Sequence, residues 1–364
     1  MKNYFFTSEA VTEGHPDKIC DKISDKILDE ALRQDFNSKM AVEATIKDDL
    51  IFIYGEATTK AKLDYEKIAL EVMRDIGYKE KYQVITKISK QSSEINKSVV
   101  KDRICAGDQG TMFGYATNET KELMPLPILV ANKLAKRLSD VRKNDEDTPL
   151  LPDGKTQVTV EYENDVPKRI DTIIISSQHK KGYPQELLKE YILENVINKT
   201  VDMNLIDKNT NILINTSGSF TLGGSFADSG TTGRKIMVDT YGGMARNGGG
   251  ALSSKDPSKV DRSASYYARY VAKNIVANDL ASRCEIGISY ALGYENPISI
   301  FIDTFNTNKV SLEDIYRYVN KNFDFSVDNI IKELDLLRPI YYELASYGHF
   351  GRNDLDLSWE KLKK

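Results

Sequence analysis

The order of helical and strand patterns constrains the fold of this 364-residue chain more than any other sequence feature. Ile19, Ile23 and Ile27 recur every four residues, which predicts one buried face of a helix, and residues 40–46 alternate like a strand. Three blocks of such patterns predict an α/β or α+β chain of three similar units. The other expected strands are 50–57, 82–88, 157–162, 170–176, 212–214, 284–290 and 299–303, and the other helices are 65–76, 126–141, 184–197, 261–276, 311–323 and 327–337.

Charge and hydropathy argue against two broad classes of protein, although a local basic cluster is still open. The net charge of -4 argues against a dedicated nucleic-acid-binding protein. The sequence contains no apolar run of about 18 residues, which a membrane span would need, and its first residues lack the pattern of a signal peptide. We therefore expect a cytoplasmic protein that binds neither nucleic acid nor membranes.

Cysteine and histidine are too scattered to indicate several common kinds of site. Cys20, Cys105 and Cys284 form no Cys-x-x-Cys pair, so neither a disulfide framework nor a cysteine zinc site is indicated. The chain has only three histidines. A bound metal would therefore use oxygen ligands, which suit magnesium.

The start of the first predicted helix is a candidate phosphate site. Residues 14–18 read Gly-His-Pro-Asp-Lys, and a helix N-terminus offers free amides and a partial positive charge to an anion. His15 would donate to that anion and Asp17 would hold a divalent ion. The alternative is structural: Asp17 caps the helix and His15 packs as an ordinary polar residue.

A glycine-dense segment supplies two more candidates. Ten of the 22 glycines fall between residues 218 and 250, and glycine lets the backbone approach a phosphate closely. Residues 230–235 combine glycines with two basic side chains, Arg234 and Lys235, and are a candidate phosphate site. They lack the spacing of a Walker loop, so an ordinary surface hairpin is the alternative to that site. Three charged residues follow the triglycine 248–250: Lys255, Lys259 and Asp261. Two ammonium groups and a carboxylate would fit a metal–polyphosphate ligand. The alternative is a solvated basic turn with an aspartate cap.

Weaker candidates have ordinary structural explanations. Asp108 lies in a predicted Asx turn, and residues 153–155 read as a hairpin turn before a strand. Glu43 and Glu56 fall on adjacent predicted strands, where exposed carboxylates are the usual case. Residues 91–103 are polar and aperiodic, so we expect a mobile surface loop of the kind that often carries function.

Taken in order, these motifs resemble the S-adenosylmethionine synthetase (methionine adenosyltransferase) family. The resemblance runs from Thr7 to Arg352 and rests on residues 14–18, 107–120 (GDQGTMFGYATNET), 233–247 (GRKIMVDTYGGMARN) and 255–263 (KDPSKVDRS). It implies three domains around an approximate threefold axis, at 1–98, 105–222 and 223–358, with a mobile active-site loop at 91–104. It also implies a homodimer that forms the active sites between its chains, and a tetramer made of two such dimers.

The resemblance further implies a reaction and its ions. The methionine sulfur attacks C5′ of ATP to give S-adenosylmethionine, and the tripolyphosphate is then hydrolysed to phosphate and pyrophosphate. Magnesium, with two ions per site, and potassium assist. A thioether has no proton to lose, so the chemistry needs alignment and charge stabilisation rather than a general base.

Roles carry over from the family by matching positions. The implied catalytic groups are His15, Lys155, Arg234, Lys235 and Lys255. The implied ATP site comprises these five with Asp153, Ser219, Phe220, Asp228 and Ala251, and the implied methionine site comprises Glu56, Gln91, Asp108, Asp228 and Lys259. Asp17 and Asp261 are the implied magnesium ligands and Glu43 the potassium ligand.

This sequence departs from the family pattern at several positions. Ser219 stands where the family usually has arginine, and residues 251–255 read Ala-Leu-Ser-Ser-Lys in place of Ala-Phe-Ser-Gly-Lys. The loop after Gln91 is also a few residues shorter than in familiar bacterial members. Two other functions are open to such a chain: a kinase, although the Walker and protein-kinase motifs are missing, and a nucleotide-binding regulator without turnover.

Overall fold

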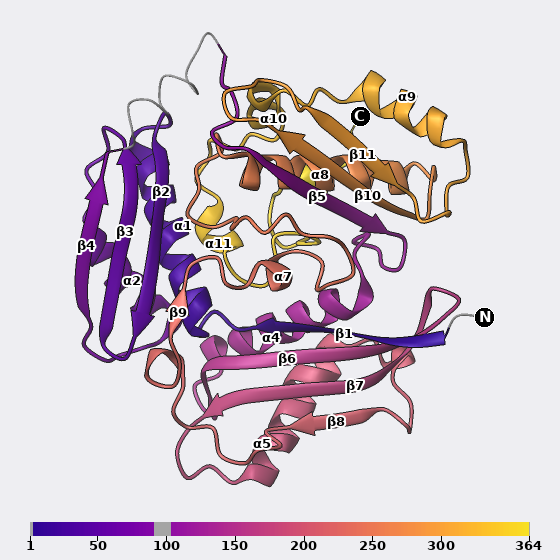
Figure 1. Ribbon diagram of the computed structural model, residues 1–364. Coiled ribbons are helices and arrows are strands. Elements are labelled where there is room, and N and C mark those ends of the chain that lie inside the picture. Colours follow the sequence, from indigo (N-terminus) through magenta and orange to yellow (C-terminus); the bar gives the residue numbers. More distant parts are fainter. Residues whose placement is uncertain (1–2, 91–102, 364) are drawn as a thin grey trace.

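Three sheets lie around the periphery of the molecule in the computed structural model, which describes residues 3–90 and 103–363 (Figure 1). Their strand orders are β4-β3-β2-β9, β1-β6-β7-β8 and β11-β10-β5. One long helix packs against each sheet: α1 (Pro16–Gln34) on the first, α4 (Leu126–Asn144) on the second and α8 (Val260–Ala277) on the third. Among the described residues, no helix combines the length and the apolar character needed to cross a bilayer.

The first sheet illustrates how the sequence pattern becomes structure. β2 (Lys39–Lys47) and β3 (Leu50–Thr58) form an antiparallel hairpin, and α2 (Tyr65–Ile76) leads to β4 (Gln83–Ser89), which runs parallel to β3. Alternate residues of β2 are buried together with the isoleucines of α1, because a strand presents every second side chain to one face.

The second and third sheets repeat this order of elements. In the second, β6 (Leu150–Glu163) and β7 (Val166–His179) form the hairpin, and α5 (Gln185–Ile192) leads to β8 (Asn211–Ile214), parallel to β7. In the third, β10 (Arg283–Tyr290) and β11 (Ser299–Asp303) form the hairpin, and α9 (Leu312–Asn322) follows. The shorter helical segments are η1 (Leu193–Ile197), α6 (Asn198–Thr200), η2 (Met203–Leu205), η3 (Gly224–Phe226), α7 (Ile236–Asp239), α10 (Val327–Glu333), α11 (Tyr341–Leu344) and η4 (Ser358–Glu360).

Each sheet is completed by a strand from another part of the chain. β1 (Asn3–Val11) precedes α1 but pairs with β6 in the second sheet. β5 (Gly110–Thr117) precedes α4 but pairs with β10 in the third sheet, and β9 (Gly230–Thr231) precedes α8 but pairs with β2 in the first. The exchange is cyclic, so every unit gives its first strand to the next.

The expected fold class, three similar units of mixed sheet and helix, is confirmed. The three exchanged strands were not among the predicted elements. Residues 153–155 are not a hairpin turn but part of β6, where Lys155 pairs with Val11 on one side and Ser176 on the other. The helix predicted at 184–197 continues beyond α5 as a π-helix, and the one predicted at 327–337 ends at Glu333.

Close packing of the exchanged strand β5 on α8 generates a stability prediction. A Cβ at Gly114 would lie 2.0 Å from the carbonyl carbon of Ala268, so β5 would have to move off the helix. We expect Gly114→Ala to lower the free energy of unfolding by about 1–3 kcal/mol. Gly110→Ala on the same strand is the control, because its Cβ meets nothing closer than 3.6 Å. Equal urea midpoints for the two variants at one protein concentration would contradict the prediction.

Candidate functional site

His15 is fixed in one orientation at the start of α1. It is the N-cap residue in extended backbone conformation, and its Nδ1 accepts a hydrogen bond from the Asp17 amide at 3.2 Å. The proton of the neutral ring is therefore assigned to Nε2, which is left as a donor. Burial, with the nearby charge of Lys235, lowers the pKa of His15 to about 4. The imidazole is thus neutral at pH 7 and suited to donating a hydrogen bond.

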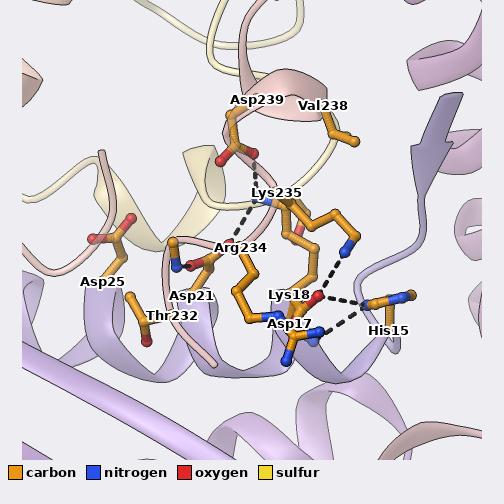
Figure 2. A network of polar contacts seen from close by, with 12 residues as sticks. His15, Asp17, Lys18, Asp21, Asp25, Thr232, Arg234, Lys235, Val238 and Asp239 are labelled. Carbon is orange, nitrogen blue, oxygen red and sulfur yellow. Dashed lines mark hydrogen bonds and ion pairs between the residues drawn. The ribbon is translucent and has the colours of Figure 1, made fainter. Parts of the chain in front are cut away.

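Asp17 lies at the centre of a group of cations. Its Oδ2 accepts from Lys235 Nζ at 2.6 Å, and its Oδ1 lies 3.3 Å from Arg234 Nε (Figure 2). Oδ1 also accepts from the Thr231 amide at 3.0 Å. Burial opposes ionisation, but the Lys235 and Thr231 bonds hold the pKa of Asp17 below its usual value. The charged carboxylate draws both basic side chains to the N-terminus of α1.

Three further predicted residues join this group. Lys155 and Asp228 lie near enough to His15 to influence its pKa. Asp153 Oδ2 accepts from the Gly224 amide at 2.8 Å, and burial raises the pKa of Asp153 to about 6. We call the whole set the His15 cluster, which consists of His15, Asp17, Asp153, Lys155, Asp228, Arg234 and Lys235.

A second group, the Lys255 cluster, consists of Asp108, Lys255, Lys259 and Asp261. Lys255 Nζ donates to Asp261 Oδ2 at 2.6 Å, and Lys259 Nζ donates to Asp256 Oδ2 at 2.5 Å. The turn that carries Asp108 is held beside them, because the Gly107 amide donates to the Ser258 carbonyl at 3.2 Å.

Packing within the chain accounts for two of the three consecutive glycines. A Cβ at Gly248 would lie 1.9 Å from the carbonyl oxygen of Thr111, and one at Gly250 would lie 2.1 Å from Asp261 Oδ1. The triglycine segment therefore passes directly over the carboxylate of the Lys255 cluster. Packing within the chain therefore explains Gly248 and Gly250, whereas the sequence suggested only that a ligand closely approaches this segment.

The segments that carry the two clusters lie close to each other and to the first sheet. Lys255 pairs through its backbone with Ala41 of β2, and Ala41 is the cross-strand partner of Glu56. A Cβ at Gly233 would lie 2.6 Å from the methyl group of Ala251. Within residues 3–90 and 103–363, no ion pair joins the His15 cluster to the Lys255 cluster.

The remaining predicted residues lie at the margins. Glu43 is half-buried on the outer face of β2 opposite Tyr54. Phe220 is held by His179, which accepts from the Phe220 amide at 3.1 Å and donates its own amide to the Phe220 carbonyl at 2.9 Å. Ser219 is exposed beside it. Gln91 and most of the predicted loop lie outside the described residues.

Comparison with known proteins covers almost the entire chain. Models of the N-terminal, central and C-terminal domains of S-adenosylmethionine synthetase match residues 3–101, 103–220 and 222–361. The chain belongs to the S-adenosylmethionine synthetase family. It is also 52% identical over 384 aligned positions to the S-adenosylmethionine synthase of Finegoldia magna (strain ATCC 29328 / DSM 20472 / WAL 2508), with 100% of this chain and 98% of that protein covered.

In this member of the family, a buried ion-pair network behind Asp17 was not predicted from the sequence. Lys18 is fully buried, and its Nζ donates to Asp21 Oδ2 at 3.0 Å and to Asp239 (Figure 2). Asp21 in turn accepts from the Gly233 amide. One signal was available: Asp17, Asp21, Asp25 and Asp29 recur every four residues, and like charges at that spacing disfavour an exposed helix.

The network predicts that Lys18 is essential for stability. Lys18→Ala would leave the carboxylates of Asp21 and Asp239 buried without their cation, and we expect a loss of about 3–5 kcal/mol in the free energy of unfolding. Lys26→Ala on the same helix is the control, since Lys26 is more exposed and lies 3.8 Å from Glu30. There we expect about 1 kcal/mol or less. Urea unfolding measures both, and a similar small loss in the two variants would refute the network's role.

Proposed function

We propose that the chain is a methionine adenosyltransferase, which makes S-adenosylmethionine from ATP and L-methionine. One observation carries the proposal: Arg234 and Lys235 gather around His15 and Asp17 at a helix N-terminus, in a chain that matches this family along its length. Such a terminus with adjacent cations is suited to a polyphosphate.

The mechanism follows from what the reacting groups need. The methionine sulfur attacks C5′ and tripolyphosphate leaves, so the site must align sulfur with carbon and stabilise the departing negative charge. His15 donates from Nε2 to the leaving side near C5′, and a neutral ring does this without competing for a proton. The charge of the tripolyphosphate is met by Lys155, Arg234, Lys235 and Lys255.

The second step hydrolyses tripolyphosphate to phosphate and pyrophosphate with the same cations. Asp153, Ser219, Phe220, Asp228 and Ala251 complete the ATP site. Bonds from His179 and Gly224 fix the backbone around Phe220 and the carboxylate of Asp153, which supports their part in holding the nucleotide. Methionine is bound by Glu56, Gln91, Asp108, Asp228 and Lys259, of which Gln91 lies outside the described residues.

Members of the family generally depend on metal ions. Among the described residues, no three His, Cys, Asp or Glu side chains come together as a metal cage. Asp17 and Asp261 each offer hard carboxylate oxygens beside a lysine, and this fits Mg²⁺ that takes most of its ligands from phosphate and water. Asp17 and Asp261 would hold the two magnesium ions, which neutralise charge on the polyphosphate.

Potassium is assigned to Glu43. This carboxylate shares the outer face of the first sheet with the hydroxyl groups of Thr45 and Tyr54, which lie 3.4 Å apart. Three oxygen-bearing side chains on one face fit a monovalent cation, which prefers such ligands. K⁺ held there would lie on the same sheet as Glu56.

The active form is a homodimer, and two dimers form a tetramer. This assembly is proposed from the family resemblance, which implies active sites formed between two chains. The protein acts in the cytoplasm. The domain ranges 1–98, 105–222 and 223–358 and the active-site loop 91–104 remain predictions.

One assay separates the proposal from the two other functions. Incubation with ATP, methionine, Mg²⁺ and K⁺ should yield S-adenosylmethionine, phosphate and pyrophosphate. ADP or a phosphorylated methionine would identify a kinase instead, and binding without turnover would identify a regulator. Either of these results would overturn the proposal.

Lys255 tests the assignment of the polyphosphate cations. A cation aimed at charge that develops on the leaving group stabilises the transition state more than bound ATP. We expect Lys255→Ala to lower kcat by about 10²–10³-fold, by analogy with the loss of an oxyanion donor, with a small change in KM for ATP. Steady-state kinetics decide, and an effect confined to KM would reject the role.

The magnesium assignment is tested by neutralising each carboxylate. Asp17→Asn and Asp261→Asn remove the charge that attracts Mg²⁺ while they retain size, so both should raise the magnesium concentration needed for half-maximal rate and lower kcat. Asp256→Asn is the control, because Asp256 is also a buried partner of a lysine but is not assigned to metal. Magnesium titrations that coincide for wild type and both site variants would exclude metal ligation.

A further inference from the structure

A row of four buried carboxylates on α1 holds three separate segments of the chain. Asp17, Asp21 and Asp25 are 0% exposed and Asp29 is 2% exposed. Each accepts a backbone N–H from a segment more than 200 residues away: Asp17 from Thr231, Asp21 from Gly233, Asp25 from Ser254, and Asp29 from Tyr341 and Tyr342. Buried charge is costly unless it is bonded, so these amides and the nearby cations determine whether the row is stable.

Asp21 is the member of this row that binds the loop 230–235 directly before Arg234 and Lys235. Its Oδ1 accepts from the Gly233 amide at 2.8 Å, and its Oδ2 accepts from Lys18 Nζ at 3.0 Å. Lys18 is itself anchored to Asp239. The carboxylate therefore cannot turn away from the loop without breaking a fully buried ion pair.

Gly233 is the point of the loop that most needs an anchor. Its φ of +81° lies in the left-handed region, and a Cβ there would lie 2.6 Å from the methyl group of Ala251, so only glycine fits. Glycine leaves the backbone free to adopt other conformations unless a bond fixes it. The Asp21 carboxylate supplies that bond.

The residues on either side explain why this anchor matters. Thr232 is held by Ser24 at 2.9 Å and by the backbone of Ala44, so the chain entering Gly233 is fixed. Arg234 and Lys235 follow immediately and converge on Asp17 (Figure 2). The Gly233 amide is thus the last fixed backbone group before the two cations.

We propose that Asp21 is a positioning residue for the reaction: its bond to the Gly233 amide sets the direction in which Arg234 and Lys235 leave the loop. This inference rests on the proposed function, since it concerns the alignment of the two cations on tripolyphosphate. Asp21 touches no reacting atom and acts through the backbone.

The test compares three variants on one helix. Asp21→Ala removes the acceptor, so we expect kcat for S-adenosylmethionine formation to fall about 10–100-fold, because small misplacements of positioned groups have effects of this size. Calorimetric binding of tripolyphosphate should weaken as well. Asp29→Ala is the matched control: it also removes a buried carboxylate bonded to backbone amides, and it should lower thermal stability while kcat stays within about 3-fold of wild type.

Rescue by the conservative variant distinguishes positioning from general destabilisation. Asn at position 21 has one acceptor oxygen where aspartate has two, so it accepts from Gly233 with its NH2 group turned toward Lys18, and Lys18 keeps only Asp239. We expect Asp21→Asn to retain more kcat and tripolyphosphate affinity than Asp21→Ala, because one of the two acceptors remains. If Asp21→Ala does not fold, Asp21→Leu, which has the shape of aspartate without the acceptor, should give the same losses.

The outcomes separate this inference from the proposed function. If wild type forms no S-adenosylmethionine, the proposed function is wrong. If wild type is active but the acceptor-free variants match Asp29→Ala in kcat and tripolyphosphate affinity, the positioning role is wrong.

Discussion

Burial of charge on α1 is the constraint on which the rest of this structure depends. A helix with an aspartate at every fourth position is unfavourable in water and more so in a core, unless donors from elsewhere reach each carboxylate. The donors come from the glycine-rich loop, the segment before Lys255 and the turn at α11. The helix therefore fixes the relative positions of segments that the sequence keeps far apart, and both cationic segments of the proposed site are among them.

The same electrostatic logic describes how the proposed site would receive its ligand. Lys235 is paired with Asp17 and Lys255 with Asp261, so each carboxylate assigned to magnesium already has an ammonium partner. On the proposed assignment, a magnesium–polyphosphate complex would give each lysine a phosphate in place of its carboxylate, and each carboxylate a metal ion in place of its lysine. Every charge would keep an opposite partner, which would limit the cost of desolvation.

Local patterns in the sequence predicted individual elements and motifs, and most contacts between distant segments were not predicted. The periodicity of the isoleucines predicted α1, and phosphate-binding logic selected His15, Asp17, Arg234 and Lys235, which the structure brings together. The strands β1, β5 and β9 were missed because their pairing partners lie in other units, and β9 has only two residues. Lys18 and Asp21 were missed because polar residues on a helix are usually solvated, and only the distant Asp239 and Gly233 explain their burial. The substrate roles of the site residues came from family resemblance, which periodicity and spacing do not supply.

The cyclic exchange of strands has a consequence for how the protein is made. The first sheet contains β2, β3 and β4 from the first 90 residues, yet its order is complete only when β9, at residues 230–231, has been added. The third sheet likewise needs β5 to remain unpaired until β10 is made, more than 160 residues later. On a ribosome that synthesises from the N-terminus, the early strands leave the exit tunnel long before their partners. Their edges must remain unpaired during that interval. We therefore expect the nascent chain to be most prone to aggregation, and most dependent on chaperones, while the middle of the sequence is being synthesised.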